Sequence, residues 1–62
     1  MQFHILRRYQ VEAAVGLGRS TIYAKMANGE FPRPIKLGQR AVGWRSCDIE
    51  NWLNTVDAKH NG

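Results

Sequence analysis

The sequence predicts a small α+β domain, mostly helical, with the order helix, helix, two-stranded hairpin, helix. Three observations predict this order. Two short helical patterns are separated only by Gly16-Leu17-Gly18. Two alternating apolar runs follow Pro32 and Pro34, as in a hairpin. An apolar stripe with helical spacing lies near the C-terminus. The 62 residues are expected to form one domain (1–62), near the lower size limit for a chain without disulfides or metals.

The first helix is expected from about Tyr9 to Val15. Val11, Ala14 and Val15 have the i, i+3, i+4 spacing of one apolar side. Gly16 follows directly and can supply the positive φ that often ends a helix.

The second helix follows almost at once. Gly18 is an acceptable N-cap, and Asn28-Gly29 is a strong stop signal. So few residues join the two helices that they cannot lie antiparallel. They are therefore expected to cross at a steep angle, which is the geometry of a helix-turn-helix.

A hairpin is expected after the second helix. The segment EFPRP, residues 30–34, is extended because each proline disfavours helix at the preceding residue. Phe31 is expected to fill the gap between helix and sheet. Residues 35–37 and 42–44 each alternate apolar with other residues, and residues 38–41 form a basic tip between them.

The last helix has the clearest pattern. Ser46 is a good N-cap, and Asp48 and Glu50 lie in the first turn, where the helix dipole favours acids. The apolar stripe has i, i+3, i+4, i+7 spacing and consists of Ile49, Trp52, Leu53 and Val56. Residues 1–5 and 59–62 are expected to fray. The complete order is that of a small winged helix-turn-helix.

Charge is distributed unevenly along the chain, whose formal net charge is +4. Residues 1–45 contain eight basic and two acidic residues, whereas residues 46–62 contain one basic and three acidic residues. A basic body with a weakly acidic tail favours a polyanion as partner. A solubilising surface charge explains the composition equally well.

The second helix has one side with few charges. At about 100° per residue, Ile22 and Met26 share a side that is expected to face the core. The opposite side offers hydroxyls, a phenol and alanines, which suit contacts with phosphates, base edges and thymine methyl groups. A tolerant solvent-facing surface is the alternative. The residues of this helix expected to contact DNA are Arg19, Ser20, Thr21, Tyr23, Ala24 and Lys25.

The hairpin offers a second candidate contact. Gln39 and Arg40 lie at its tip, and Lys36 lies on its first strand. A wing beside a helix-turn-helix commonly reaches a minor groove, where arginine responds to the narrow width. Ordinary surface turn residues are the alternative interpretation.

The stretch from residue 16 to residue 53 resembles the AlpA-type phage and prophage regulators, small winged-helix proteins related to phage excisionases. The matching pieces are GL-x-RSTIY, G-x-FP and KLG-x-RAVGWR-S, and the similarity spans roughly residues 6 to 56. The resemblance implies a MerR-like winged helix with its second helix in the major groove and its wing in the neighbouring minor groove. The positions that match the family's contacts are Arg19, Ser20, Thr21 and Tyr23 on the helix, and Gln39 and Arg40 on the wing.

The chain departs from the family at two positions. Gly18 stands where relatives commonly have serine, which weakens the N-cap. Ala24 stands where many relatives have a basic residue. Lys25 is expected to compensate as a phosphate anchor.

The resemblance implies sequence-specific binding of double-stranded DNA at a promoter or an attachment site. The family includes transcriptional regulators of prophages and genomic islands, and excisionase-type recombination directionality factors; the sequence leaves both roles open. An integrase and neighbouring copies on DNA are candidate further partners. The alternative from another class is a protein-binding adaptor that modulates an integrase or response regulator without gripping DNA.

No enzymatic chemistry is expected. Cys47 lies at the start of the last helix, and His4 and His60 lie near opposite ends of the chain, so no catalytic or metal-binding set is predicted. No cofactor is expected, and a domain this small has little room for a small-molecule substrate. No membrane contact is expected, because the apolar runs are too short to span a bilayer. A single cysteine suits a reducing compartment, which favours the cytoplasm. The resemblance to phage and prophage regulators implies a bacterial, nucleoid-associated protein.

Overall fold

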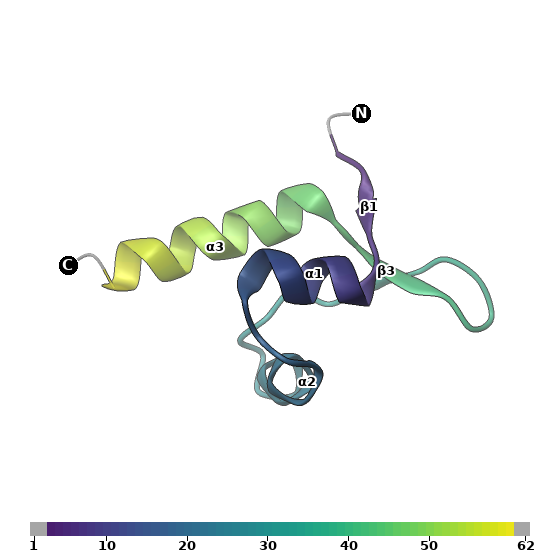
Figure 1. Cartoon of the computed structure of the whole chain (residues 1–62), viewed down its shortest axis with the longest axis horizontal. Coiled ribbons are helices and arrows are strands. Elements are labelled where there is room, and N and C mark those ends of the chain that lie inside the picture. Colours follow the sequence, from purple (N-terminus) through teal and green to yellow (C-terminus); the bar gives the residue numbers. More distant parts are fainter. Residues whose placement is uncertain (1–2, 61–62) are drawn as a thin grey trace.

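The computed structural model describes the backbone of residues 3–60 and the side chains of residues 3–57. Figure 1 shows how the helices are arranged around a small sheet. The predicted class, α+β and mostly helical, is confirmed, and the order of elements agrees with a winged helix. In chain order the elements are β1 (Ile5–Leu6), α1 (Arg8–Val15), α2 (Arg19–Ala27), β2 (Ile35–Lys36), β3 (Val42–Arg45) and α3 (Ser46–His60).

The turn between α1 and α2 has the geometry that its glycines predict. Gly16 has a φ of 72°, and its N–H donates to the Glu12 carbonyl at 2.9 Å. Gly18 is the extended N-cap of α2, and its carbonyl accepts the N–H of Ile22 at 3.0 Å. In Figure 1, α1 lies across the view while α2 is seen end-on, so the helices cross steeply, as expected.

α2 ends at the predicted stop signal. Asn28 is its C-cap, and Gly29 follows with a φ of 73°. The N–H of Gly29 donates to the Met26 carbonyl at 3.1 Å, and the N–H of Glu30 donates to the Lys25 carbonyl at 2.8 Å. These bonds satisfy helix carbonyls that would otherwise lack partners and turn the chain towards the sheet.

The sheet contains the predicted hairpin and one additional strand. The strand order is β1-β3-β2, and both pairings are antiparallel. Within the hairpin, Ile35 pairs with Gly43 and Lys36 pairs with Val42. β1 occupies the other edge of β3, where Leu6 pairs with Trp44. The sheet therefore has three strands, with β3 at its centre.

The expectation that residues 1–5 fray is wrong for the part that the structure describes. Ile5 pairs with Arg45, and the N–H of His4 donates to Ser46 Oγ at 3.0 Å. The N–H of Ser46 donates back to the His4 carbonyl at 2.8 Å. Residues 4 and 5 are therefore hydrogen-bonded along one edge of β3 and at the start of α3. Residues 1, 2, 61 and 62 lie outside the described residues, and α3 continues through residue 60.

Ser46 has a different role from the predicted one. α3 begins at Ser46 itself, directly after β3. Its hydroxyl accepts the N–H of His4 and so joins the start of α3 to the chain before β1. Of the two acids that were expected in the first turn of α3, Asp48 lies there and Glu50 lies beyond it.

The core lies where the helices meet the sheet. Trp44 is fully buried, and its Nε1 donates to the Pro32 carbonyl at 2.9 Å. Phe31 packs edge-on against Trp52 with ring centroids 4.8 Å apart, so it fills the gap between helix and sheet as predicted. Ala14 was expected to face this core, but it is exposed. The buried core residues are Val11, Ile22, Phe31, Trp44 and Ile49.

Candidate nucleic-acid interface

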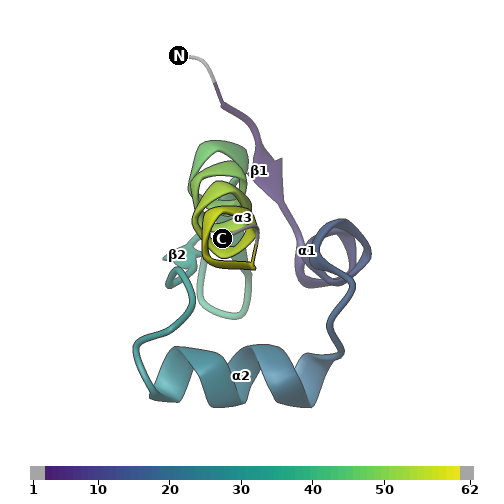
Figure 2. The same ribbon diagram turned by 90° about the vertical axis from the view of Figure 1, so that its left-hand side faces the viewer.

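The outward side of α2 is the side that the sequence predicts. Ile22 is fully buried, and Met26 is partly buried against the core. Figure 2 shows α2 along the lower edge of the molecule, with α1 and α3 above it. The exposed residues of α2 are Arg19, Ser20, Thr21, Tyr23, Ala24 and Ala27.

The exposed side of α2 combines an aromatic ring with a cation at the start of the helix. The guanidinium of Arg19 lies over the Tyr23 ring, 5.8 Å from its centroid. The side chain of Tyr23 is 40% exposed. No acidic residue lies in the helix, RSTIYAKMA. Gly18 has no side chain to cap the first N–H groups of α2, so this end remains favourable for an anion.

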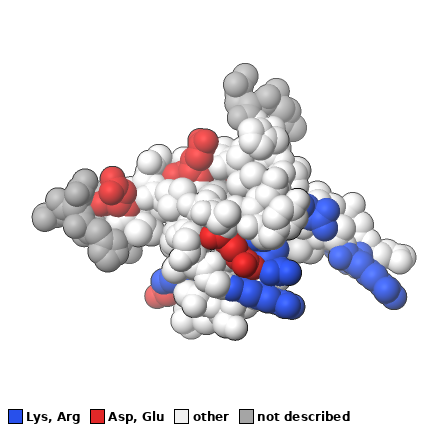
Figure 3. All heavy atoms as spheres, in the orientation of Figure 1, with Lys and Arg blue, Asp and Glu red and all other residues white. Residues whose placement is uncertain are grey.

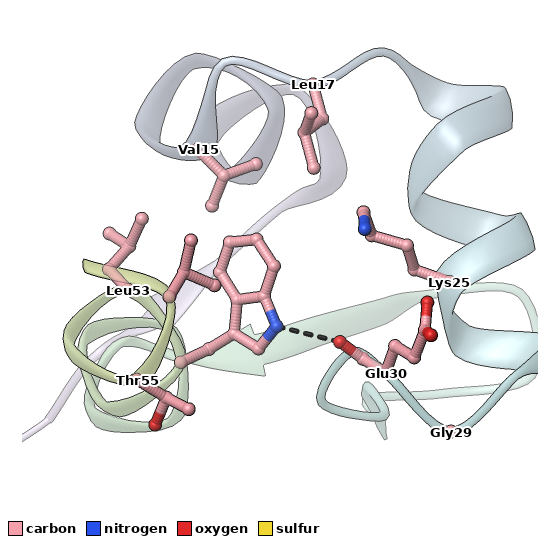
Figure 4. Close-up of a pocket in the computed structure, with 9 residues that line it drawn as sticks. Val15, Leu17, Lys25, Gly29, Glu30, Leu53 and Thr55 are labelled. Atoms are coloured by element: carbon pink, nitrogen blue, oxygen red, sulfur yellow. Dashed lines mark hydrogen bonds between the residues drawn. The ribbon is translucent and has the colours of Figure 1, made fainter. Parts of the chain in front are cut away.

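Lys25 lies apart from the other α2 candidates. It is half-buried, and it lines a hollow of about 650 Å³ between the end of α2 and α3. Figure 4 shows Lys25 reaching into this space, near Glu30. Two helical positions span about 200°, so Lys25 lies almost opposite Tyr23 on α2. The structure therefore groups Arg19, Ser20, Tyr23 and Ala24 but separates Lys25 from them.

The hollow beside Lys25 has mostly apolar walls. Trp52 forms part of its lining, and its Nε1 donates to the Glu30 carbonyl at 2.7 Å (Figure 4). Val15 and Leu17 contribute from the α1–α2 turn. Because these side chains also pack against the core, the hollow is a gap at the edge of the core.

The hairpin forms the wing. Its loop closes where the Ala41 carbonyl accepts the N–H of Leu37 at 2.7 Å and that of Gly38 at 3.3 Å. Figure 1 shows this loop projecting away from the helices on the right. The predicted wing residues are all exposed: Lys36, Gln39 and Arg40.

The structure adds residues that the sequence analysis did not select. Arg7, Arg8 and Tyr9, at the start of α1, line a second hollow of about 330 Å³ with Arg40 and Val42 of the hairpin. In Figure 3 the basic atoms are concentrated towards the lower right, where α1, α2 and the wing lie. The sequence showed the arginine pair only as part of the net charge, because the approach of the wing to α1 is a tertiary feature.

The remaining chemistry is limited in the described part of the chain. Among residues with described positions, no three His, Cys, Asp or Glu side chains lie together in a way that could hold a metal ion. Cys47 is half-buried, with its Sγ 4.0 Å from Asp48 Oδ1. None of the described helices has both the length and the hydrophobicity to cross a membrane.

Comparison with known proteins gives consistent matches. The family model described as prophage CP4-57 regulatory protein (AlpA) matches residues 4–56. The uncharacterized protein ORF88 of Enterobacteria phage P4 is 38% identical over 52 residues, which cover 84% of this chain and 59% of that protein. The protein named DNA-binding transcriptional activator AlpA of Escherichia coli (strain K12) is 34% identical over 56 residues, covering 81% of this chain and 80% of its own length. The chain thus spans less than two thirds of the phage relative.

Proposed function

This chain belongs to the family of the prophage CP4-57 regulatory protein (AlpA), and on that premise we propose that it is a sequence-specific double-stranded DNA-binding regulator. In this proposal α2 enters the major groove, and the wing contacts the neighbouring minor groove. The Escherichia coli relative, whose name describes a DNA-binding transcriptional activator, supports the DNA-binding part.

The observation that carries the proposal is the exposed side of α2. It lacks acidic side chains, and its Ser20 hydroxyl and Tyr23 phenol are exposed near the helix start. The exposed Thr21 hydroxyl lies at the edge of this side, one turn before Lys25. Such groups form hydrogen bonds with phosphates and base edges. The small side chain of Ala24 allows the helix backbone to come close to the bases. A carboxylate on this side would be repelled by the phosphates, so its absence from α2 favours a polyanion as partner.

The wing supports the same partner. Lys36 on β2 and Gln39 and Arg40 in the loop that follows are exposed. This loop projects away from the helices (Figure 1). With α2 in a major groove, a projecting loop on the same molecule is suited to the adjacent minor groove, where the potential attracts arginine. We leave Lys25 out of the base-contacting set because it lies on the other side of α2.

The proposal is tested with fluorescently labelled duplexes from the DNA around the gene and the nearest attachment site. We expect retardation that weakens steeply between low and moderate salt, since phosphate contacts release counterions. Duplexes that show no retardation even at low salt would contradict the proposal. In that case the protein-binding adaptor, acting on an integrase or response regulator, would be favoured.

The biological role depends on where the protein binds. Footprinting on the same DNA distinguishes the two roles that the family suggests. Protection upstream of a promoter supports transcriptional regulation, whereas protected direct repeats at an attachment site support an excisionase-type role. In the second case an integrase and neighbouring copies of the chain become the expected partners.

Base recognition is tested separately from affinity. Arg19→Ala and Thr21→Ala should reduce the ratio of affinities for cognate and scrambled DNA, since both residues are exposed in the first turn of α2. An unchanged ratio in both variants would contradict the assignment of α2 as the recognition helix. Thermal melting of each variant serves as the control for folding.

A further inference from the structure

The start of α1 and the base of the wing meet at a basic hollow that shares only Arg40 with the proposed contacts of α2 and the wing. Its lining residues are Arg7, Arg8, Tyr9, Arg40 and Val42, and its volume is about 330 Å³. We propose that this hollow binds one phosphodiester of the DNA backbone, on the strand that separates the major groove at α2 from the minor groove at the wing. This inference rests on the proposed function.

The charges of the hollow are only partly compensated within the protein. Arg8 forms an i,i+4 ion pair with Glu12, which offsets its charge. That pair is the only salt bridge found among the described residues, so Arg7 and Arg40 retain uncompensated charges beside the hollow. Two guanidinium groups that line the same hollow repel each other, and an anion bound between them offsets this repulsion. A phosphate accepts paired hydrogen bonds from each planar guanidinium.

The backbone of α1 favours an anion at the same place. Arg7 is the extended N-cap of α1, and no acidic side chain lies in the first turn. The N–H of Arg7 donates to Gln10 Oε1 at 2.8 Å, which fixes the backbone entry into the helix. The positive end of the helix dipole therefore adds to the two arginine charges instead of being neutralised by a carboxylate.

Tyr9 gives the hollow an amphipathic wall. Its side chain is 69% exposed, so most of the ring and the phenol can reach a ligand. Val42, which also lines the hollow, is 37% exposed. A phosphodiester has a charged centre flanked by apolar sugar carbons, and the phenol can donate to a phosphate oxygen. The mixture of guanidinium groups, a phenol and an apolar side chain fits this ligand.

The position of the hollow identifies the backbone strand. In Figure 1 the first turn of α1 lies above α2 and at the side nearest the wing. Figure 3 shows basic atoms over this region. In duplex DNA a single backbone strand separates a major groove from the adjacent minor groove. That strand therefore passes the start of α1 when α2 and the wing occupy the two grooves.

The inference changes the role of one wing residue. Arg40 holds a phosphate at the edge of the minor groove together with Arg7, and Gln39 remains the residue of the wing tip closest to the bases. Phosphate contacts position the protein without reading sequence. Losing either arginine should therefore weaken binding to cognate and scrambled DNA by a similar factor.

The test compares four variants of the full chain with the wild type: Arg7→Gln, Arg40→Gln, the double variant, and Arg45→Gln as a matched control. Arg45 lies at the far end of β3 from the wing loop, and its guanidinium lies over the Phe3 ring. Dissociation constants are measured on cognate and scrambled duplexes over a range of salt. We expect each single variant of the hollow to lose about tenfold in affinity on both duplexes, with a salt slope lower by about 1.

The double variant tests whether the two arginines share one phosphate. If they do, its loss is smaller than the product of the two single losses, because the second substitution removes a contact that is already weakened. Ethylation interference should locate the phosphate, with one position between the two grooves sensitive in the wild type, less sensitive in Arg7→Gln and insensitive in the double variant. Melting temperatures verify that each variant folds.

Distinct outcomes overturn this inference and the proposed function. If the wild type binds DNA and Arg7→Gln binds as tightly as Arg45→Gln, the hollow holds no phosphate. Losses in the double variant that multiply fully would place the arginines on separate phosphates and also overturn it. If the wild type binds none of the duplexes, the proposed function fails together with the inference.

Discussion

At the scale of single residues, Trp44 joins the sheet to the segment that follows α2. Its side chain is fully buried, and its indole N–H donates to the Pro32 carbonyl. We expect Trp44→Ala to lower the free energy of unfolding by about 3–5 kcal/mol, a large fraction of the stability of a domain this small. Thermal melting followed by circular dichroism measures the effect.

A second aromatic serves as the control for this substitution. Tyr9 is 69% exposed, so Tyr9→Ala should leave the melting temperature close to that of the wild type. A Trp44→Ala protein that melts cooperatively within a few degrees of the wild type would contradict the assignment of Trp44 to the core.

Gly43 is needed in the central strand for steric reasons. A Cβ at this position would collide with the Ile5 side chain and lie 3.1 Å from the Leu6 carbonyl oxygen. We expect Gly43→Ala to destabilise the protein by about 1–3 kcal/mol, because β1 has to move away from β3. Urea unfolding measures the change.

The wing offers a matched glycine. At Gly38 a Cβ meets nothing within 4 Å, so Gly38→Ala should change the stability little. Equal destabilisation by both substitutions would mean that flexibility, and not the close approach of β1, accounts for the effect at Gly43.

Residue roles that depend on sequence spacing were predictable, and those that depend on distant segments were not. Ile22, Trp44 and Ile49 lie on periodic apolar patterns, and all three are buried. The hydroxyl of Ser46 instead accepts the N–H of His4, 42 positions earlier, a contact that no local pattern indicates. For the same reason the approach of Arg40 to Arg7 could not be predicted from the sequence.

At the scale of elements, α2 has two sides with separate roles. Ile22 packs in the core, whereas the exposed side does not contribute to it. Ala24 lies on that side, so its substitution should affect binding and leave folding unchanged. We expect Ala24→Glu to lower the affinity for cognate DNA at least tenfold, because a carboxylate would approach the phosphates. Electrophoretic mobility shifts at low salt measure the loss.

Asn54→Glu provides the control for charge. Asn54 is exposed on α3, and the substitution introduces the same charge on another helix. It should reduce affinity much less than Ala24→Glu. Similar losses in the two variants would show that net charge alone governs binding and that α2 has no special position in the complex.

Helices with an apolar stripe or clear start and stop residues were predictable from the sequence. α3 has a stripe of four apolar positions, and α2 has a glycine at its start and a glycine just after its end. β1 has only two residues, too few to establish an alternation, and it exists because β3 has an edge to pair with. Lys25 was predicted as a contact from its charge, although helical spacing already sets it almost opposite Tyr23. The hollow that Lys25 lines with residues of α3 is a tertiary feature that the sequence does not indicate.

At the scale of the whole molecule, the separation of charge parallels the separation of surfaces. The eight basic residues of positions 1–45 include those of α2, the wing and the hollow at α1, whereas α3 carries three acids. This division gives the protein one side suited to a polyanion. It also predicts that a duplex approaches from the side of α2 and the wing, with α3 facing away.

Binding on that side should stabilise the entire fold, since the proposed contacts come from α1, α2 and the wing, which are assembled only in the folded state. Cognate DNA at a hundred times its dissociation constant adds about 2.7 kcal/mol, which raises the melting temperature of a domain this size by roughly 10–20 °C. We expect this rise to shrink with added salt, because the phosphate contacts weaken. Differential scanning calorimetry of the wild type and Ala24→Glu, each with cognate and scrambled duplexes, measures it. Ala24→Glu alters only the exposed side of α2, so it should show a smaller rise at the same DNA concentration while keeping its own melting temperature without DNA. A rise of equal size in all four samples would contradict recognition through α2.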